Sequence, residues 1–127
     1  MNARYARDRT TGFASPASDA VEGPIDLSQP LDLKNPSHYP VRVRGTTFAA
    51  RGILDGDILI ADTAGSPQAG QLVIAWAAGR VLLAELQRRG NAWWLASGDN
   101  THPPLEVDPA RDVEIWANVT SVVREKA

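Results

Sequence analysis

Cysteine is absent from this chain of 127 residues. Its absence excludes a disulfide framework, a thiolate nucleophile, a zinc ribbon and an iron–sulfur site. Histidine is scarce, and the spacing of His38 and His102 fits no metal motif, so we expect no metal. No apolar run approaches the ~18 residues that a membrane helix needs, and no hydrophobic stretch follows the arginines at the start. We therefore expect a cytoplasmic protein that does not bind a membrane.

Basic residues are not in excess, since thirteen of them face fifteen acidic residues and the formal net charge is −2. This balance argues against direct nucleic-acid binding through a basic face. Lysine is rare, because Lys34 and Lys126 are the only two among the basic residues. Arginine stays protonated at physiological pH and cannot act as a general base. A mechanism that needs a neutral side-chain amine therefore has two positions to draw on.

The composition, 43% hydrophobic and 22% charged, is that of one compact globular domain. Proline recurs through the first forty residues too often for a helix, with isolated apolar residues between the prolines. We predict an N-terminal arm and linker over residues 1–38, extended over a β domain formed by residues 39–127.

Short strands separated by glycine and proline turns are predicted for this domain. Val41 and Val43 alternate with arginines, as in a half-buried strand that starts near Tyr39. The further predicted elements are a helical turn within 45–52 and strands over 58–61, 72–76, 80–86, 92–96 and 113–123, with a tight turn at 77–79. The pattern predicts a mostly-β barrel or sandwich.

Few side chains form a recognisable catalytic pattern. Asp55 and Asp57 flank a glycine, so we interpret them as turn-capping residues rather than as a carboxylate pair. Trp93 and Trp94 are neighbours on one predicted strand, so at most one faces a ligand, and we expect a core or interface role. His102 is expected at the surface, without the partners that a site requires.

Four segments occur in a specific order along the chain. They are residues 13–27, the stretch Gly45-Thr46-Thr47-Phe48, the stretch 52–62 around Asp-Gly-Asp, and the strand 70–75. Together they resemble the LexA/UmuD family of self-cleaving S24 peptidase domains, in which Gly-Asp-Ser-Met stands at the place of residues 45–48. The resemblance covers residues 12–124. It implies a LexA/UmuD C-terminal-domain-like fold, with partly barrel-like β-sheets and an extended arm, and a homodimer.

The family uses a serine–lysine dyad, in which a lysine of lowered pKa removes the proton of the serine hydroxyl. Carried over, the nucleophile position falls on Thr47 and the lysine position on Ala84. Threonine keeps a hydroxyl with a stiffer side chain, whereas alanine removes the base. Glu85 points to the other face of the strand, and Lys34 and Lys126 lie where only a special loop path would bring them to the site. The resemblance thus implies a pseudo-peptidase.

Thr11-Gly12 occupies the place of the family's scissile Ala-Gly or Cys-Gly bond, and only eleven residues precede Gly12. We interpret it as a vestigial cleavage site in a chain close to the processed form of UmuD. The resemblance then implies a non-proteolytic accessory subunit in SOS mutagenesis and translesion DNA synthesis. Its expected partners are a second copy and a UmuC-type Y-family polymerase, with the RecA filament as a further candidate; no cofactor is implied.

Two alternatives remain open. One is an S24 endopeptidase with residual self-cleavage through Thr47, and the other is a dimerisation regulator of catalytic paralogues. We do not expect a DNA-binding repressor, because no helix-turn-helix pattern precedes the domain.

Overall fold

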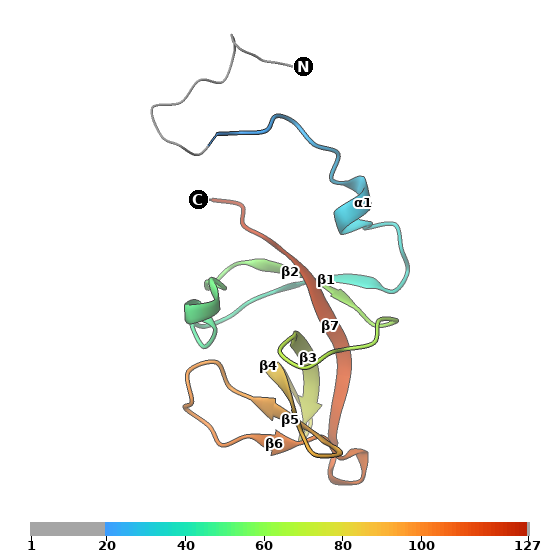
Figure 1. The fold of residues 1–127 in the computed structure, drawn as a ribbon, viewed down its shortest axis with the longest axis vertical. Helices are drawn as coiled ribbons and strands as arrows, with labels where there is room; N and C mark the ends of the chain where they lie inside the picture. The colour runs from blue at the N-terminus through green and yellow to red at the C-terminus, as the bar shows by residue number, and fades with distance from the viewer. Residues whose placement is uncertain (1–19, 127) are drawn as a thin grey trace.

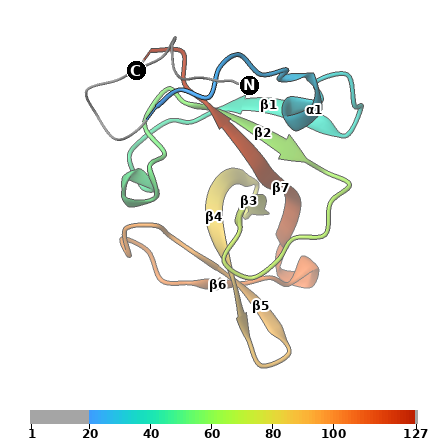
Figure 2. The same ribbon diagram turned by 45° about the horizontal axis from the view of Figure 1, so that its top comes forward.

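The computed structural model describes residues 20–126 and is built around one seven-stranded antiparallel sheet. The strands are β1 (His38–Arg42), β2 (Ile58–Asp62), β3 (Leu72–Ala77), β4 (Arg80–Arg89), β5 (Ala92–Ala96), β6 (Leu105–Glu106) and β7 (Val113–Val123). Three short helical turns accompany them: α1 (Ser28–Leu31), η1 (Ala49–Arg51) and η2 (Pro109–Arg111). The sheet curls strongly (Figure 1, Figure 2), which confirms the prediction of a mostly-β, partly barrel-like fold.

The last strand holds the sheet together. The strand order is β1-β2-β7-β3-β4-β5-β6, so β7 lies between β2 and β3 and joins the two halves of the chain. Both ladders to β7 shift register once, between Ile60 and Ala61 on β2 and between Ile74 and Ala75 on β3. Such bulges bend a strand and increase its twist, which contributes to the curl of the sheet.

The tight hairpin predicted at 77–79 is present between β3 and β4. Ala78 and Gly79 form a two-residue connection in which both residues have positive φ, 52° and 78°. Two positive φ values are what the turn favoured in short hairpins requires. β4 continues to Arg89, three residues beyond the predicted end, because its second half pairs with β5.

Two hydrophobic clusters pack on the two faces of the sheet, as alternate residues of β3 show. Leu72 and Ile74 belong to the first cluster, whereas Val73 and Ala75 belong to the second. The first cluster also contains Phe48, Ile53, Leu59, Ala61 and Ala117, and the second contains Ala84, Leu86 and Leu95. Both faces of β3 are therefore buried over residues 72–75.

The prediction that the proline-rich arm has no helix was wrong at one place. α1 is a single helical turn, and Pro30 lies inside it. Proline is tolerated there because backbone N–H groups of a first turn have no partner within the helix. Elsewhere the described part of the arm, from residue 20 onward, is irregular, and it exposes four large apolar side chains, Val21, Ile25, Leu27 and Leu33.

Candidate functional site

Thr47 lies in the turn that leads into η1, where its side chain is exposed. The next residue, Phe48, is only 2% exposed and inserts into the first cluster. The backbone of this turn is held by hydrogen bonds from Ala49 N to Thr46 O (3.0 Å) and from Ile53 N to Phe48 O (3.1 Å). Burial of Phe48 therefore fixes the turn while the threonine stays at the surface.

Gly98, in the loop after β5, packs directly against this turn. A Cβ atom at position 98 would collide with the carbonyl oxygen of Thr47 and with the ring of Phe48. The φ of Gly98 is not in the left-handed region, so the close approach, rather than the backbone conformation, requires glycine here. Sequence reasoning did not single out Gly98, since nothing near it in the chain signals a contact with residue 47.

Ala84, the position that the resemblance assigns to the lysine, lies on β4 and is 2% exposed. It pairs with Val73 and belongs to the second cluster, together with Leu86. The neighbouring strand position, Glu85, pairs with Leu72 of the first cluster. Ala84 and Glu85 consequently lie on opposite faces of the sheet, and the methyl group of Ala84 is enclosed by apolar side chains.

An ion pair joins the segment that carries Thr47 to the strand that carries Ala84. Arg51, at the end of η1, donates through Nη1 to Glu85 Oε1 at 3.0 Å, and the two side chains are 42% and 31% exposed. The second oxygen of Glu85 accepts from Gln87 Nε2. This pair was missed because its members are far apart in sequence and neither belongs to a local motif.

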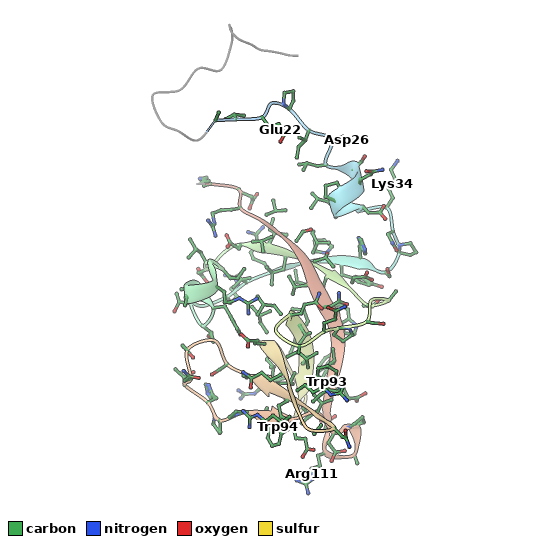
Figure 3. All side chains as sticks on the ribbon, in the orientation of Figure 1. Glu22, Asp26, Lys34, Trp93, Trp94 and Arg111 are labelled. Atoms are coloured by element: carbon green, nitrogen blue, oxygen red, sulfur yellow. The ribbon has the colours of Figure 1, made fainter. Side chains whose placement is uncertain are left out.

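Lys34, the first of the two lysines, lies far from the segment that carries Thr47 (Figure 3). Figure 3 shows Lys34 beside α1, well away from η1 and from the middle of β4. Lys126 follows the end of β7. In this arrangement, Lys34 is not available to Thr47 as a base.

The loop between η1 and β2 is held by carboxylates. Asp57 is 2% exposed and accepts hydrogen bonds from Leu54 N (2.8 Å) and from Arg124. These bonds lower the pKa of Asp57 to about 2, and the bonds from Arg124 have the largest effect. Asp55 accepts from Gly45 N at 2.7 Å. The turn-capping interpretation is therefore confirmed for Asp57, whereas Asp55 ties the loop to Gly45, ten residues earlier in the chain.

Comparison with known families matches residues 5–120 to the Peptidase S24-like family. The chain belongs to this family. It is similar to a LexA repressor of Marinobacter nauticus, with 35% identity over 94 residues that cover 74% of this chain and 46% of the relative. A LexA repressor of Ectopseudomonas mendocina is 37% identical over 87 residues, covering 68% of this chain and 43% of the relative. LexA repressor 2 of Pseudomonas syringae pv. tomato is 32% identical over 118 residues, covering 87% of this chain and 57% of the relative.

These matches confirm the family resemblance drawn from the sequence. The chain spans about half the length of the curated relatives it matches.

The aromatic pair of this S24-like chain lies at the far end of the sheet from α1 (Figure 3). Trp93 packs against the second cluster and has the Arg88 guanidinium 4.9 Å from its ring centroid. Trp94 has the Arg89 guanidinium at 5.0 Å. The arginines cover the two indole rings, which supports a packing role. His102 is exposed, as predicted.

Thr11 and Gly12 lie outside the described residues. Between residues 20 and 126, no group of three or more potential metal ligands is found. The same part of the chain has no helix with the length and apolar character needed to cross a bilayer.

Proposed function

We propose that this S24-like chain is a non-proteolytic accessory subunit that resembles the processed form of UmuD. In this proposal it acts in SOS mutagenesis and translesion DNA synthesis as a homodimer that binds a UmuC-type Y-family polymerase. The observation that carries the proposal is the buried alanine at position 84, where the family resemblance expects the catalytic lysine.

A hydroxyl becomes an effective nucleophile only when a positioned base removes its proton. Neither Ala84 nor the apolar side chains around it can accept a proton. Glu85 points to the face opposite Ala84, and its Oε1 accepts the hydrogen bond from Arg51 Nη1 at 3.0 Å. The lack of a proton acceptor at Ala84 supports the proposal that the positions Thr47 and Ala84 hold no working dyad.

Exposed aromatic residues support the homodimer in the proposal. Trp76 is 43% exposed, Tyr39 44% and Trp116 37%, and the rings of Tyr39 and Trp116 lie with centroids 5.3 Å apart. Large aromatic side chains are common anchors of stable protein interfaces. Sedimentation is expected to give twice the 13.7 kDa chain mass. Trp116→Ala should shift the protein toward monomer, whereas Trp94→Ala, which removes an arginine-covered ring, should not.

A second candidate function follows from the relatives themselves. Proteins named LexA repressor are 32%, 35% and 37% identical to this chain over aligned segments that cover 87%, 74% and 68% of it. That similarity favours a dimerisation regulator that pairs with a catalytic S24 paralogue. The residual-peptidase alternative rests on the hydroxyl that Thr47 retains.

One set of binding measurements tests these candidates. The purified chain is immobilised and offered a UmuC-type polymerase, a LexA-type repressor and a RecA filament at equal concentrations. Retention of the polymerase supports the accessory function, and retention of the repressor alone replaces it with the paralogue regulator. Intact mass after alkaline incubation tests the third candidate. A cut at Thr11-Gly12 that is abolished by Thr47→Val would establish residual peptidase activity and overturn the non-proteolytic proposal.

A further inference from the structure

A polar network outside the candidate dyad connects the arm to the sheet. His38, the first residue of β1, contacts α1 on one side and β2 on the other. Its Nδ1 lies 3.0 Å from the carbonyl oxygen of Leu31, the last residue of α1. Its Nε2 lies 3.5 Å from Asp62 Oδ2 at the end of β2. The His38 side chain is 12% exposed, so water has little access to these contacts.

Asp62 is fixed independently of the histidine. Its Oδ1 accepts from Ser37 Oγ at 3.0 Å and from Ala64 N at 2.9 Å. The hydrogen bond from Ala64 N lowers the pKa of Asp62 most, and the bond from Ser37 Oγ lowers it further. His38 adds a smaller effect in the same direction. Asp62 therefore presents a carboxylate that stays ionised across the neutral pH range.

Only the protonated ring satisfies both of its partners. Both partners of His38 are acceptors, and imidazolium is the one form of histidine with a proton on each nitrogen. A neutral ring protonated on Nδ1 keeps the Leu31 bond but directs a lone pair at Asp62. The other neutral tautomer, protonated on Nε2, keeps the Asp62 contact but directs the Nδ1 lone pair at the Leu31 carbonyl oxygen. Deprotonation thus makes one of the two contacts repulsive.

Apart from His38, α1 has few attachments to the domain. The residues of α1 are not buried. Neither hydrophobic cluster includes any of residues 20–40. A second contact runs from Ser121 Oγ to Pro30 O at 3.5 Å, near the limit for a hydrogen bond. The position of α1, which Figure 2 shows next to β1, consequently depends on the His38 contact and on the turn that follows α1, in which Asn35 N donates to Asp32 O at 3.0 Å.

We propose that His38 is a pH-operated latch: the protonated ring holds α1 against β2, and loss of its proton makes one of the two contacts repulsive and favours release of α1 together with residues 20–27, which precede it. The arm carries the exposed apolar residues Val21, Ile25 and Leu27, so release changes how this apolar segment is presented to a partner. The proposal concerns the arm alone and does not depend on the accessory function.

The charged groups around the ring set the direction of the effect. The carbonyl of Leu31 raises the pKa of His38 most, burial opposes it, and the carboxylates of Asp62 on β2 and Asp32 after α1 raise it further. A raised pKa means that the latch is closed below the ordinary histidine value of 6.5 and opens as the pH rises through the higher value of the folded protein. Asp62 and Asp32 are the charged partners that bear on this titration.

Nuclear magnetic resonance of the whole chain tests the latch directly. The ring signals of His38 give its titration curve, and the amide signals of Leu31 and Asp32 report on α1, because these two N–H groups close its helical turn. We expect the amide signals to shift, and their protection from hydrogen exchange to be lost, with the same midpoint as the ring. Amides of Leu31 and Asp32 that do not respond while His38 titrates would overturn the proposal.

Variants sharpen the measurement. His38→Gln should abolish the pH-dependent step, and Asp62→Asn should move it to lower pH by removing the fixed carboxylate. The matched control is His102→Gln, since His102 is the second histidine and is exposed in a loop; it should leave the step unchanged. A step that survives in folded His38→Gln, or that disappears in His102→Gln, would contradict the latch. If His38→Gln does not fold, the coincidence of midpoints in the unmodified chain decides.

Discussion

Arg124 and Asp57 form a two-point ion pair that links the end of β7 to the turn before β2. Arg124 Nε donates to Asp57 Oδ1 at 2.8 Å, and Nη2 donates to Oδ2 at 2.7 Å. Nη2 also donates to the carbonyl oxygen of Gly52 at 2.8 Å. One arginine thus holds both ends of the loop that follows η1. Such paired geometry is specific to the planar guanidinium group, so lysine would not replace it.

The ion pair predicts a loss of stability in acid. Because the pKa of Asp57 is about 2 in the folded chain and 3.8 ordinarily, its contribution is complete above pH 3.8 and is lost as the pH falls toward 2. Urea unfolding at a series of pH values should show this decline. Asp57→Asn should have a lower midpoint at neutral pH and a flatter dependence between pH 3.8 and 2.

The matched control is Glu125→Gln, which removes the exposed pair between Arg42 and Glu125. Exposed ion pairs contribute little, so this variant should follow the unmodified protein at neutral pH. Equal losses in the two variants at neutral pH would refute a special role for the Arg124–Asp57 pair.

Gly98→Ala should destabilise the turn that carries Thr47. The added methyl group meets the Thr47 carbonyl and the Phe48 ring, and overpacking of this kind costs about 1–3 kcal/mol of unfolding free energy. Chemical denaturation measures the loss, and Ser97→Ala, one residue earlier, serves as the control. An alanine at position 98 that leaves stability unchanged would show that the contact relaxes without cost.

Leu86→Ala tests the second hydrophobic cluster. Leu86 is 0% exposed, and truncation of a buried leucine costs about 2–5 kcal/mol because it leaves a cavity. Val81→Ala on the same strand is the control, since Val81 is 61% exposed and such surface changes usually stay within about 0.5 kcal/mol. The two unfolding curves should therefore separate clearly, and overlapping curves would argue against this core.

Thr47→Ser combined with Ala84→Lys should restore peptide cleavage if the two positions form the dyad. Each single change should do little, because nucleophile and base act as a unit. The apolar surroundings of Ala84 should lower the lysine pKa below its free value of about 10.4, which provides a neutral amine. The assay offers a separate arm peptide with an Ala-Gly bond and follows its mass.

The control for the restored dyad is Thr47→Ser with Ala84→Met, which supplies similar bulk without an amine. It should remain inactive. A double variant that circular dichroism shows to be folded, and that still cleaves nothing up to about pH 10, where a lysine amine becomes neutral, would argue against the placement of the dyad.

Local patterns in the sequence determined much of the fold. The turn at Asp55-Gly56-Asp57, the alternation at Val41 and Val43 and the hairpin at 77–79 are short-range signals, and the strands they predict are present. The family followed from the order of such segments. Each of these features depends on residues close together in the chain, so sequence reasoning can find them.

Tertiary structure alone decided the contacts that build the candidate site. Nothing local pairs Arg51 with Glu85, Arg124 with Asp57, or Gly98 with the turn at Thr47, because these contacts form only when β7 inserts between β2 and β3 and the sheet curls. The same is true of His38, whose two acceptors lie on α1 and β2. Sequence patterns specify which face of a strand is buried, whereas the partner across the sheet depends on how distant segments close upon one another.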